Sequence, residues 1–219
     1  MRVKKFMAVL SVLAAIIISS AAVYAKDIEP IRLPAPQTEG GKPLMQALKE
    51  RKSLREFSAK ELPLQMLSDM LWAACGINRP ETGGRTAPTA KNMQEIDVYV
   101  VKAEGVYLYD AKANILAPIL AGDIRAITGK QSFVKDAPVN LVFVANLSKM
   151  GGMDAASMDL YSATDTGYIS ENVYLFCASE GLATVVRGWV DKPALEKAMK
   201  LGRGQKVILA QTVGYPEGE

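Results

Sequence analysis

The fold class follows most directly from the stretch Ile96-Asp97-Val98-Tyr99-Val100-Val101-Lys102-Ala103-Glu104-Gly105-Val106-Tyr107-Leu108-Tyr109. Residues 96–102 alternate and are rich in β-branched and aromatic side chains, which is typical of a strand. Glu104-Gly105 predicts a tight turn, and residues 106–109 predict the returning strand. The sheet is therefore at least partly antiparallel. This favours a layered α+β domain, with helices flanking a mixed or antiparallel sheet, over a doubly wound α/β fold.

Outside this hairpin, hydrophobic periodicity and helix start and stop signals predict the remaining elements of the domain. Strands are expected at residues 139–145, 184–186 and 206–213, and helices at residues 43–51, 62–76, 118–128, 157–180 and 192–201. Residues 77–92 read as a polar loop. Residues 26–42 show little periodicity and several Pro and Gly, so they are expected to be a tether ahead of one domain at residues 43–219.

The N-terminus carries the features of a secretory signal peptide. Three cations precede an apolar run from Phe6 to Ile18, and small residues lead to Ala25. The apolar run is shorter than the ~20 residues that a membrane span needs, so cleavage after Ala25 is favoured over an uncleaved anchor. We therefore expect residues 1–25 to be removed. The mature protein is then expected outside the cytoplasm, in a periplasm or the exterior, with no stable membrane span.

Composition excludes several classes of function. Without residues 1–25 the chain holds 23 basic and 23 acidic residues, so nothing indicates a nucleic-acid partner. The sequence contains no His, which removes Ser-His and Cys-His hydrolase mechanisms and the commonest zinc ligand. No metal site is expected. Cys75 and Cys177 are expected to be small buried hydrophobes, although an exported location leaves a disulfide open.

A basic segment, Arg51-Lys52-Ser53-Leu54-Arg55, is the first candidate for ligand binding. Arg51 and Arg55 lie four residues apart and share a face on a helical turn. The planar guanidinium groups suit phosphate oxygens, and Ser53 can bind a phosphate or a ribityl hydroxyl. The alternative interpretation of this segment alone is a solvated basic helix end, where cations favour the helix dipole.

Two further segments supply polar and backbone groups. The loop from Arg85 to Asn92 offers hydroxyl and amide groups for a flavin ring or its chain, but its Gly, Pro, Thr and Asn also suit an ordinary turn. The segment from Gly181 to Asp191 contains Gly188, where close backbone approach to a flavin N5 atom is feasible. Alone, it equally fits a helix-to-strand connection.

Taken together, the ordered motifs resemble the nitroreductase family of flavoproteins, and within it the branch of dehydrogenases that act on azoline-containing peptides. The resemblance covers about residues 43–216. It is carried by residues 51–57, Leu71-Trp72-Ala73-Ala74-Cys75-Gly76, residues 84–90, Val98-Tyr99-Val100, residues 105–109, Gly167 with Asn172, Gly181-Leu182 and Gly214-Tyr215-Pro216.

The resemblance implies a nitroreductase-like layered fold, an intertwined homodimer, and FMN bound at the interface between subunits. It also implies ping-pong hydride transfer through flavin N5 to or from a small organic substrate, with no catalytic side chain. The implied cofactor-binding residues are Arg51, Lys52, Ser53, Arg55, Pro88, Thr89, Ala90, Asn92, Arg187 and Gly188. A protein of this fold that holds flavin or another ligand without turnover is the alternative. Because NAD(P)H is scarce outside the cytoplasm, an exported member is expected to use another electron donor.

Overall fold

The domain is built on one seven-stranded antiparallel sheet with the order β1-β6-β5-β4-β7-β9-β8. The computed structural model describes residues 28–218, and the expected signal peptide lies outside them. The strands are β1 (Ile31–Arg32), β4 (Ile96–Val101), β5 (Gly105–Asp110), β6 (Ile115–Ala121), β7 (Val139–Asn146), β8 (Ala183–Arg187) and β9 (Gln205–Gly214). The expected α+β class is confirmed.

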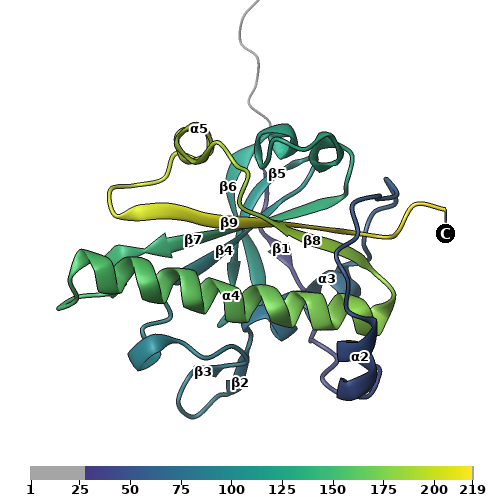
Figure 1. Ribbon diagram of the computed structural model, residues 1–219, viewed down its shortest axis with the longest axis horizontal. Helices are drawn as coiled ribbons and strands as arrows, with labels where there is room; N and C mark the ends of the chain where they lie inside the picture. The colour runs from purple at the N-terminus through teal and green to yellow at the C-terminus, as the bar shows by residue number, and fades with distance from the viewer. Residues whose placement is uncertain (1–27, 219) are drawn as a thin grey trace, which may run out of the picture.

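Helices lie on both faces of this sheet (Figure 1). Helices α3 (Leu64–Cys75) and α4 (Ala155–Glu180) pack on one face around Leu71, Phe143 and Val173, and α2 (Leu44–Glu50) contacts α4. Helix α5 (Lys192–Ala198) covers the opposite face through Leu195. A small hairpin of β2 (Ile77–Arg79) and β3 (Gly84–Arg85) lies within the expected polar loop. In residues 28–218, none of the helices has the length and apolar character needed to span a bilayer.

The predicted hairpin is confirmed in register, with Val101 opposite Val106 and Tyr99 opposite Leu108. Helix α4 starts after Asp154, whose carboxylate accepts a hydrogen bond from the Ser157 amide at 2.9 Å. It ends at Gly181, which has a φ of 74°. Glycine adopts this left-handed conformation without a steric penalty, so the chain reverses there directly into β8.

The prediction of a helix at residues 118–128 is wrong. Residues 115–121 form strand β6, and only a short 3-10 turn, Arg125–Ile127, follows. Pro118 is tolerated because the β5–β6 pairing shifts there: Val106 faces Leu120 whereas Tyr107 faces Pro118, which leaves Ile119 as an extra residue. Proline lacks a backbone N–H and is accommodated at such irregularities.

The segment expected to be a tether contributes to the domain from residue 28 onward. Ile31 pairs with Leu116 on β6, and Leu33 is buried in the main core. The Gln37 amide donates to Asp69 of α3 at 2.7 Å. Pairing with β6 gives this short, irregular segment backbone partners that its own sequence pattern does not indicate.

Candidate active site along helix α4

The basic segment at residues 51–55 lies against the C-terminal half of α4 and the start of β8. Ser53 Oγ is 2.8 Å from the Tyr174 hydroxyl, which also accepts a hydrogen bond from the Val186 amide at 2.9 Å. The Leu54 amide donates to the Thr184 carbonyl, and the Arg51 guanidinium lies 5.2 Å from the centre of the Tyr174 ring. Tyr174 therefore joins the basic segment, α4 and β8 into one unit.

The cations of this segment have positive charge available for a ligand. Lys52 and Arg55 are exposed, and Arg51 is half-buried against the aromatic ring. Within residues 28–218, none of the three forms an ion pair. Cations gathered without carboxylate partners favour the binding of an anion such as a phosphate.

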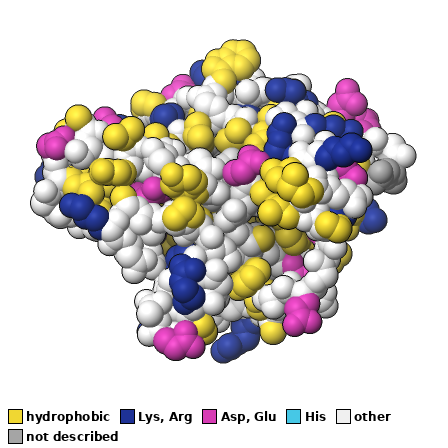
Figure 2. Space-filling view, turned by 60° about the horizontal axis from the view of Figure 1, so that its bottom comes forward, with side chains coloured by type: hydrophobic (Ala, Val, Ile, Leu, Met, Phe, Trp, Pro, Cys, Tyr) yellow, Lys and Arg dark blue, Asp and Glu magenta, His cyan; other side chains and the backbone are white. Residues whose placement is uncertain are grey.

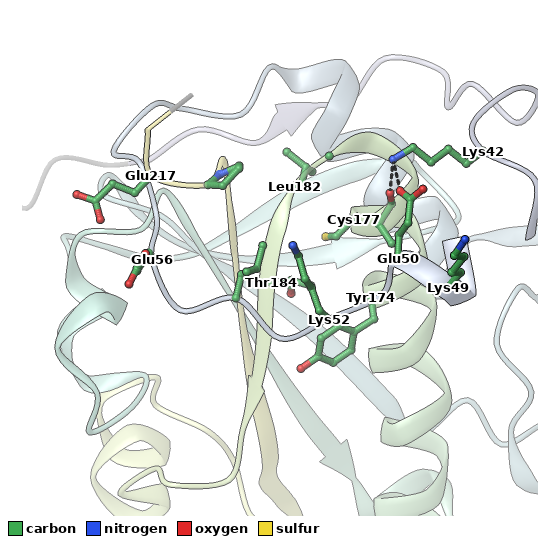
Figure 3. Close-up of a pocket in the computed structure, with 14 residues that line it drawn as sticks. Lys42, Lys49, Glu50, Lys52, Glu56, Tyr174, Cys177, Leu182, Thr184 and Glu217 are labelled. Atoms are coloured by element: carbon green, nitrogen blue, oxygen red, sulfur yellow. Dashed lines mark hydrogen bonds and ion pairs between the residues drawn. The ribbon is translucent and has the colours of Figure 1, made fainter. Parts of the chain in front are cut away.

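Beside this segment is an open cavity of about 600 Å³, between α2, the end of α4 and the C-terminal residues (Figure 3). Lys52, Thr184 and Tyr174 line it. Lys42 is already engaged there, because its ammonium donates to Glu50 at 2.8 Å and to the Ala178 carbonyl at 3.0 Å. The size is within the range of small-molecule and cofactor sites.

The polar loop meets α4 at a different place. The Ala90 amide donates to Asp165 Oδ2 at 2.9 Å, and the Thr89 hydroxyl donates to Glu95 Oε2 at 3.1 Å. Pro88 and Asn92 are exposed beside these anchors. A second cavity, of about 60 Å³, lies behind the loop. The loop is therefore bound on its inner side by two buried carboxyl groups, and it exposes Pro88 and Asn92 to solvent.

Within one chain the two clusters do not form one cradle. The basic segment contacts Tyr174 and the loop contacts Asp165, nine residues apart on the same helix. At about 1.5 Å per residue, these contacts are separated by roughly 13 Å along the helix axis. The residues expected to bind the cofactor are therefore divided between two separate positions on α4.

The third expected segment is placed at the end of β8. The Arg187 side chain is buried. It donates to the Thr128 carbonyl at 2.6 Å and to Asn140 Oδ1 at 2.9 Å. Burial lowers the pKa of this guanidinium to about 10, so it stays charged at neutral pH. Only the backbone of Arg187 and the exposed Gly188 are available to a ligand.

Comparison with known proteins decides the family. The family model described as "Nitroreductase family" matches residues 48–215, most of the chain. The protein belongs to the nitroreductase family. A crystal structure of a candidate nitroreductase from Ralstonia eutropha JMP134 is 45% identical, covers 88% of this chain and 91% of its own, and has a TM-score of 0.84.

A further relative supports the same family, and another solved structure shares the fold. A candidate nitroreductase of Methanocaldococcus jannaschii is 32% identical over 155 residues, which are 66% of this chain and 78% of that protein. The NADPH:FMN oxidoreductase of Vibrio harveyi, solved with NAD⁺, shares the fold at 18% identity with a TM-score of 0.60, over 80% of this chain and 69% of its own.

Sequence reasoning missed three residues that organise the site of this nitroreductase-family protein: Tyr174, Glu95 and Asp165. The two carboxyls are buried, and burial together with the nearby Asp165 charge raises the pKa of Glu95. A signal for Asp165 was present, because Asp165, Ile169 and Val173 recur every four residues on the buried face of α4. Nothing local distinguishes Tyr174 or Glu95.

The two cysteines are free, buried thiols in separate helices. The interpretation as small hydrophobes is confirmed, and the disulfide that remained open does not form. Burial raises the pKa of the Cys75 thiol to about 11 and raises that of Cys177 further. Both thiols are therefore protonated at neutral pH and are poor nucleophiles.

Proposed function

We propose that this nitroreductase-family protein is an exported FMN-dependent oxidoreductase that transfers hydride to or from a small organic substrate by a ping-pong mechanism. The observation that carries the proposal is the pair of clusters on α4. Free cations at Arg51–Arg55 lie beside a cavity of about 600 Å³, and a solvent-facing polar loop at Pro88–Asn92 lies further along the helix.

The residues present fit FMN. A terminal phosphate at neutral pH carries nearly two negative charges, which Arg51, Lys52 and Arg55 can match without breaking an ion pair among residues 28–218. Ser53, held by Tyr174, offers a hydroxyl for the ribityl chain or phosphate. When bound, FMN supplies hydride transfer through its N5 atom. The protein's part is to bind, orient and expose one ring face.

The end of β8 suits contact with a flat ring edge. Gly188 is exposed, and a Cβ added there would meet only the Leu209 side chain, at 3.6 Å. The hydrogen bonds of the buried Arg187 side chain to Thr128 and Asn140 fix the backbone immediately before Gly188. In the proposed mechanism this backbone orients the ring, and no side chain acts as a catalytic acid or base.

Flavin uptake tests the proposal. We expect the purified protein to be yellow or to bind added FMN, and to show bleaching of the flavin absorption on anaerobic addition of a reductant, followed by reoxidation on addition of a substrate such as a quinone or nitroaromatic. Flavin that binds but exchanges no electrons with any donor or acceptor would favour the alternative, a non-catalytic binding protein. Absence of flavin binding would contradict the proposed oxidoreductase and leave only the binding of another ligand.

The separation of the two clusters on α4 favours a homodimer in which each site takes one cluster from each chain. Six of the ten large hydrophobic side chains exposed in residues 28–218 lie on α2 and α4, namely Leu44, Met45, Leu48, Leu160, Tyr161 and Tyr168. Figure 2 shows hydrophobic side chains spread over the face seen from the β2–β3 side. An interface that buries these helices would be of the obligate class, above ~2,000 Å².

Light scattering is expected to give twice the chain mass at micromolar concentration. Tyr168→Asp, which places a charge at the centre of α4, is expected to shift the protein to monomers and to lower FMN affinity at least tenfold, because a desolvated unpaired charge opposes association. Leu64→Asp on α3 is the control, since Leu64 is similarly exposed (44% against 46%) but lies off α2 and α4. A stable monomer that binds FMN tightly would contradict the shared site.

Export is supported by the n-region, the apolar run and the small residues before Ala25. An exported flavoprotein must exchange electrons with something other than the cytoplasmic NAD(P)H pool, such as a quinone, an exported redox protein or the substrate. N-terminal sequencing of the protein from its native host should find a chain that starts at Lys26. A cytosolic chain that starts at Met1 would contradict both the location and the unusual donor.

A further inference from the structure

Two carboxyl groups meet in the protein interior under the polar loop. Glu95 immediately precedes β4 and is fully buried, and Asp165 on α4 is 3% exposed. The two carboxyl groups bind the consecutive residues Thr89 and Ala90, and both line the small cavity behind the loop. Two negative charges so close together in a buried place are strongly unfavourable, whereas a neutral carboxyl group beside a carboxylate is stable.

Each carboxyl holds one residue of the loop. Asp165 Oδ2 accepts from the Ala90 amide at 2.9 Å, and Glu95 Oε2 accepts from the Thr89 hydroxyl at 3.1 Å. The same hydroxyl accepts a hydrogen bond from the Gln94 amide at 3.0 Å. Both ends of the turn from Thr89 to Gln94 are thus tied to the acidic pair.

The turn between these ties has an unfavourable backbone. Lys91, Asn92 and Gln94 have φ values of 51°, 55° and 50°, in the left-handed region that non-glycine residues rarely adopt. Such residues persist only where the surrounding contacts hold them. The conformation of this turn therefore depends on the bonds to Glu95 and Asp165.

The second carboxyl oxygen of Glu95, Oε1, is the atom at which a bound proton would be most favourable. Glu95 Oε1 is buried and has no hydrogen-bond partner among residues 28–218. If Oε1 carries a proton, it becomes a donor and can bind the Asp165 carboxylate, which removes an unsatisfied buried atom.

The charged and titratable groups around the pair are already engaged or neutral. Arg85 donates to Gln94 Oε1 and the Cys75 carbonyl, and Lys149 donates to Asp97 and the Gln94 carbonyl. The remaining titratable groups that line the cavity behind the loop are Asp97, Cys75 and Tyr109. Neither cation forms an ion pair with Glu95 or Asp165, so a proton is the available means of neutralising the pair.

We propose that Glu95 and Asp165 share one proton, and that this pair positions the Thr89–Gln94 turn in the shape that receives the cofactor. Glu95 and Asp165 are positioning residues, because they act through Thr89 and Ala90. The part of this inference that concerns the cofactor rests on the proposed function.

The pair makes the turn sensitive to a rise in pH. Burial, followed by the charge of Asp165, raises the pKa of Glu95 above its unfolded value of about 4.3. The folded protein therefore binds this proton more tightly than the unfolded chain. The stabilisation that depends on the proton is complete below about pH 4.3 and is lost as the pH rises through the raised pKa. Above it, two adjacent carboxylates repel each other and the turn loosens.

Amide hydrogen exchange in the flavin-free protein tests the pair directly. Protection of the Ala90 and Gln94 amides, corrected for intrinsic exchange, is expected to fall at least tenfold between about pH 5 and about pH 9. Glu95→Gln, which keeps a donor and an acceptor but cannot ionise, should retain protection at every pH. Glu95→Ala should lack it throughout. Glu104→Gln, the same exchange at the far end of the hairpin, should follow the wild type.

FMN titration over the same pH range tests the link to the cofactor. Ionisation of the FMN phosphate changes the affinity of every variant with pH. Relative to Glu95→Gln, the affinity of the wild type and of Glu104→Gln is therefore expected to fall as the pH rises. Two results would overturn the proposal of a shared proton. One is amide protection in the wild type that does not change with pH, and the other is protection in Glu95→Gln as low as in Glu95→Ala. Protection that behaves as expected, with no FMN bound at any pH, would support the pair and overturn the cofactor assignment instead.

Discussion

Alanine at Arg51 or at Arg55 is expected to weaken FMN binding tenfold or more for each residue. A hydrogen bond to a charged group contributes about 1.5–3 kcal/mol, and about 1.4 kcal/mol corresponds to tenfold in affinity. Neither guanidinium is neutralised by a carboxylate within residues 28–218, so their full charge is available to the phosphate. Quenching of FMN fluorescence on titration measures the effect.

The two arginines differ in what else they do. Arg51 rests on the Tyr174 ring, so its removal also loosens the packing around Ser53. Arg55 is exposed, and its replacement should leave the fold unchanged. Arg55→Ala is therefore the cleaner variant.

Arg203→Ala, at an exposed turn before β9, is the matched control and should bind FMN as the wild type does. Lysine in place of either arginine keeps the charge but loses the planar fork, so an intermediate affinity is expected. Wild-type affinity in both alanine variants would remove the phosphate assignment from this segment.

Arg187→Ala is expected to lower the free energy of unfolding by about 3 kcal/mol or more. The guanidinium is buried and is a donor to both the Thr128 carbonyl and Asn140 Oδ1. Its loss leaves the Thr128 carbonyl, a buried acceptor, without this bond and opens a cavity beside Thr128 and Asn140. Urea unfolding followed by circular dichroism measures the change.

The same variant should also weaken FMN binding, because the end of β8 loses the contacts that hold the backbone before Gly188. Arg187→Lys retains the charge but cannot reach two acceptors with one fixed fork, so it should recover only part of the stability. Arg203→Ala again serves as the control for loss of an arginine at the surface. A change of less than about 1 kcal/mol for Arg187→Ala would contradict a structural role.

The family and most of the fold were predictable from local patterns. The hairpin at residues 96–109, the long helix ending at Gly181 and the Asp191-capped helix all form from signals within a few residues of one another. Residues 118–121 were predicted as the start of a helix because an apolar run with one proline has no strand periodicity. Pairing with β5 and the irregularity at Pro118 made that run a strand.

The three segments of the candidate site could be predicted from the sequence, but their positions relative to one another could not. Arg51–Arg55, Pro88–Asn92 and Arg187-Gly188 could be recognised because each is contiguous. The contacts that anchor them could not be predicted, because Tyr174 lies 121 residues from Ser53 and Asp165 lies 75 residues from Ala90. Contacts at such separations depend on how α4 crosses the sheet, which no local pattern encodes.

By itself, the sequence determined the α+β class, the antiparallel hairpin, the basic and polar segments, and the absence of histidine chemistry, because short-range periodicity, turn residues and composition carry that information. Only the tertiary structure decided that the two candidate ligand-binding segments contact separate turns of α4, that Arg187 turns its charge into the core, and that Glu95 and Asp165 are buried beneath the same loop. The physical reason is burial. The packing of distant elements decides whether a charged side chain faces solvent, a ligand or another carboxyl group. That packing therefore determines the free-energy cost of keeping the side chain charged.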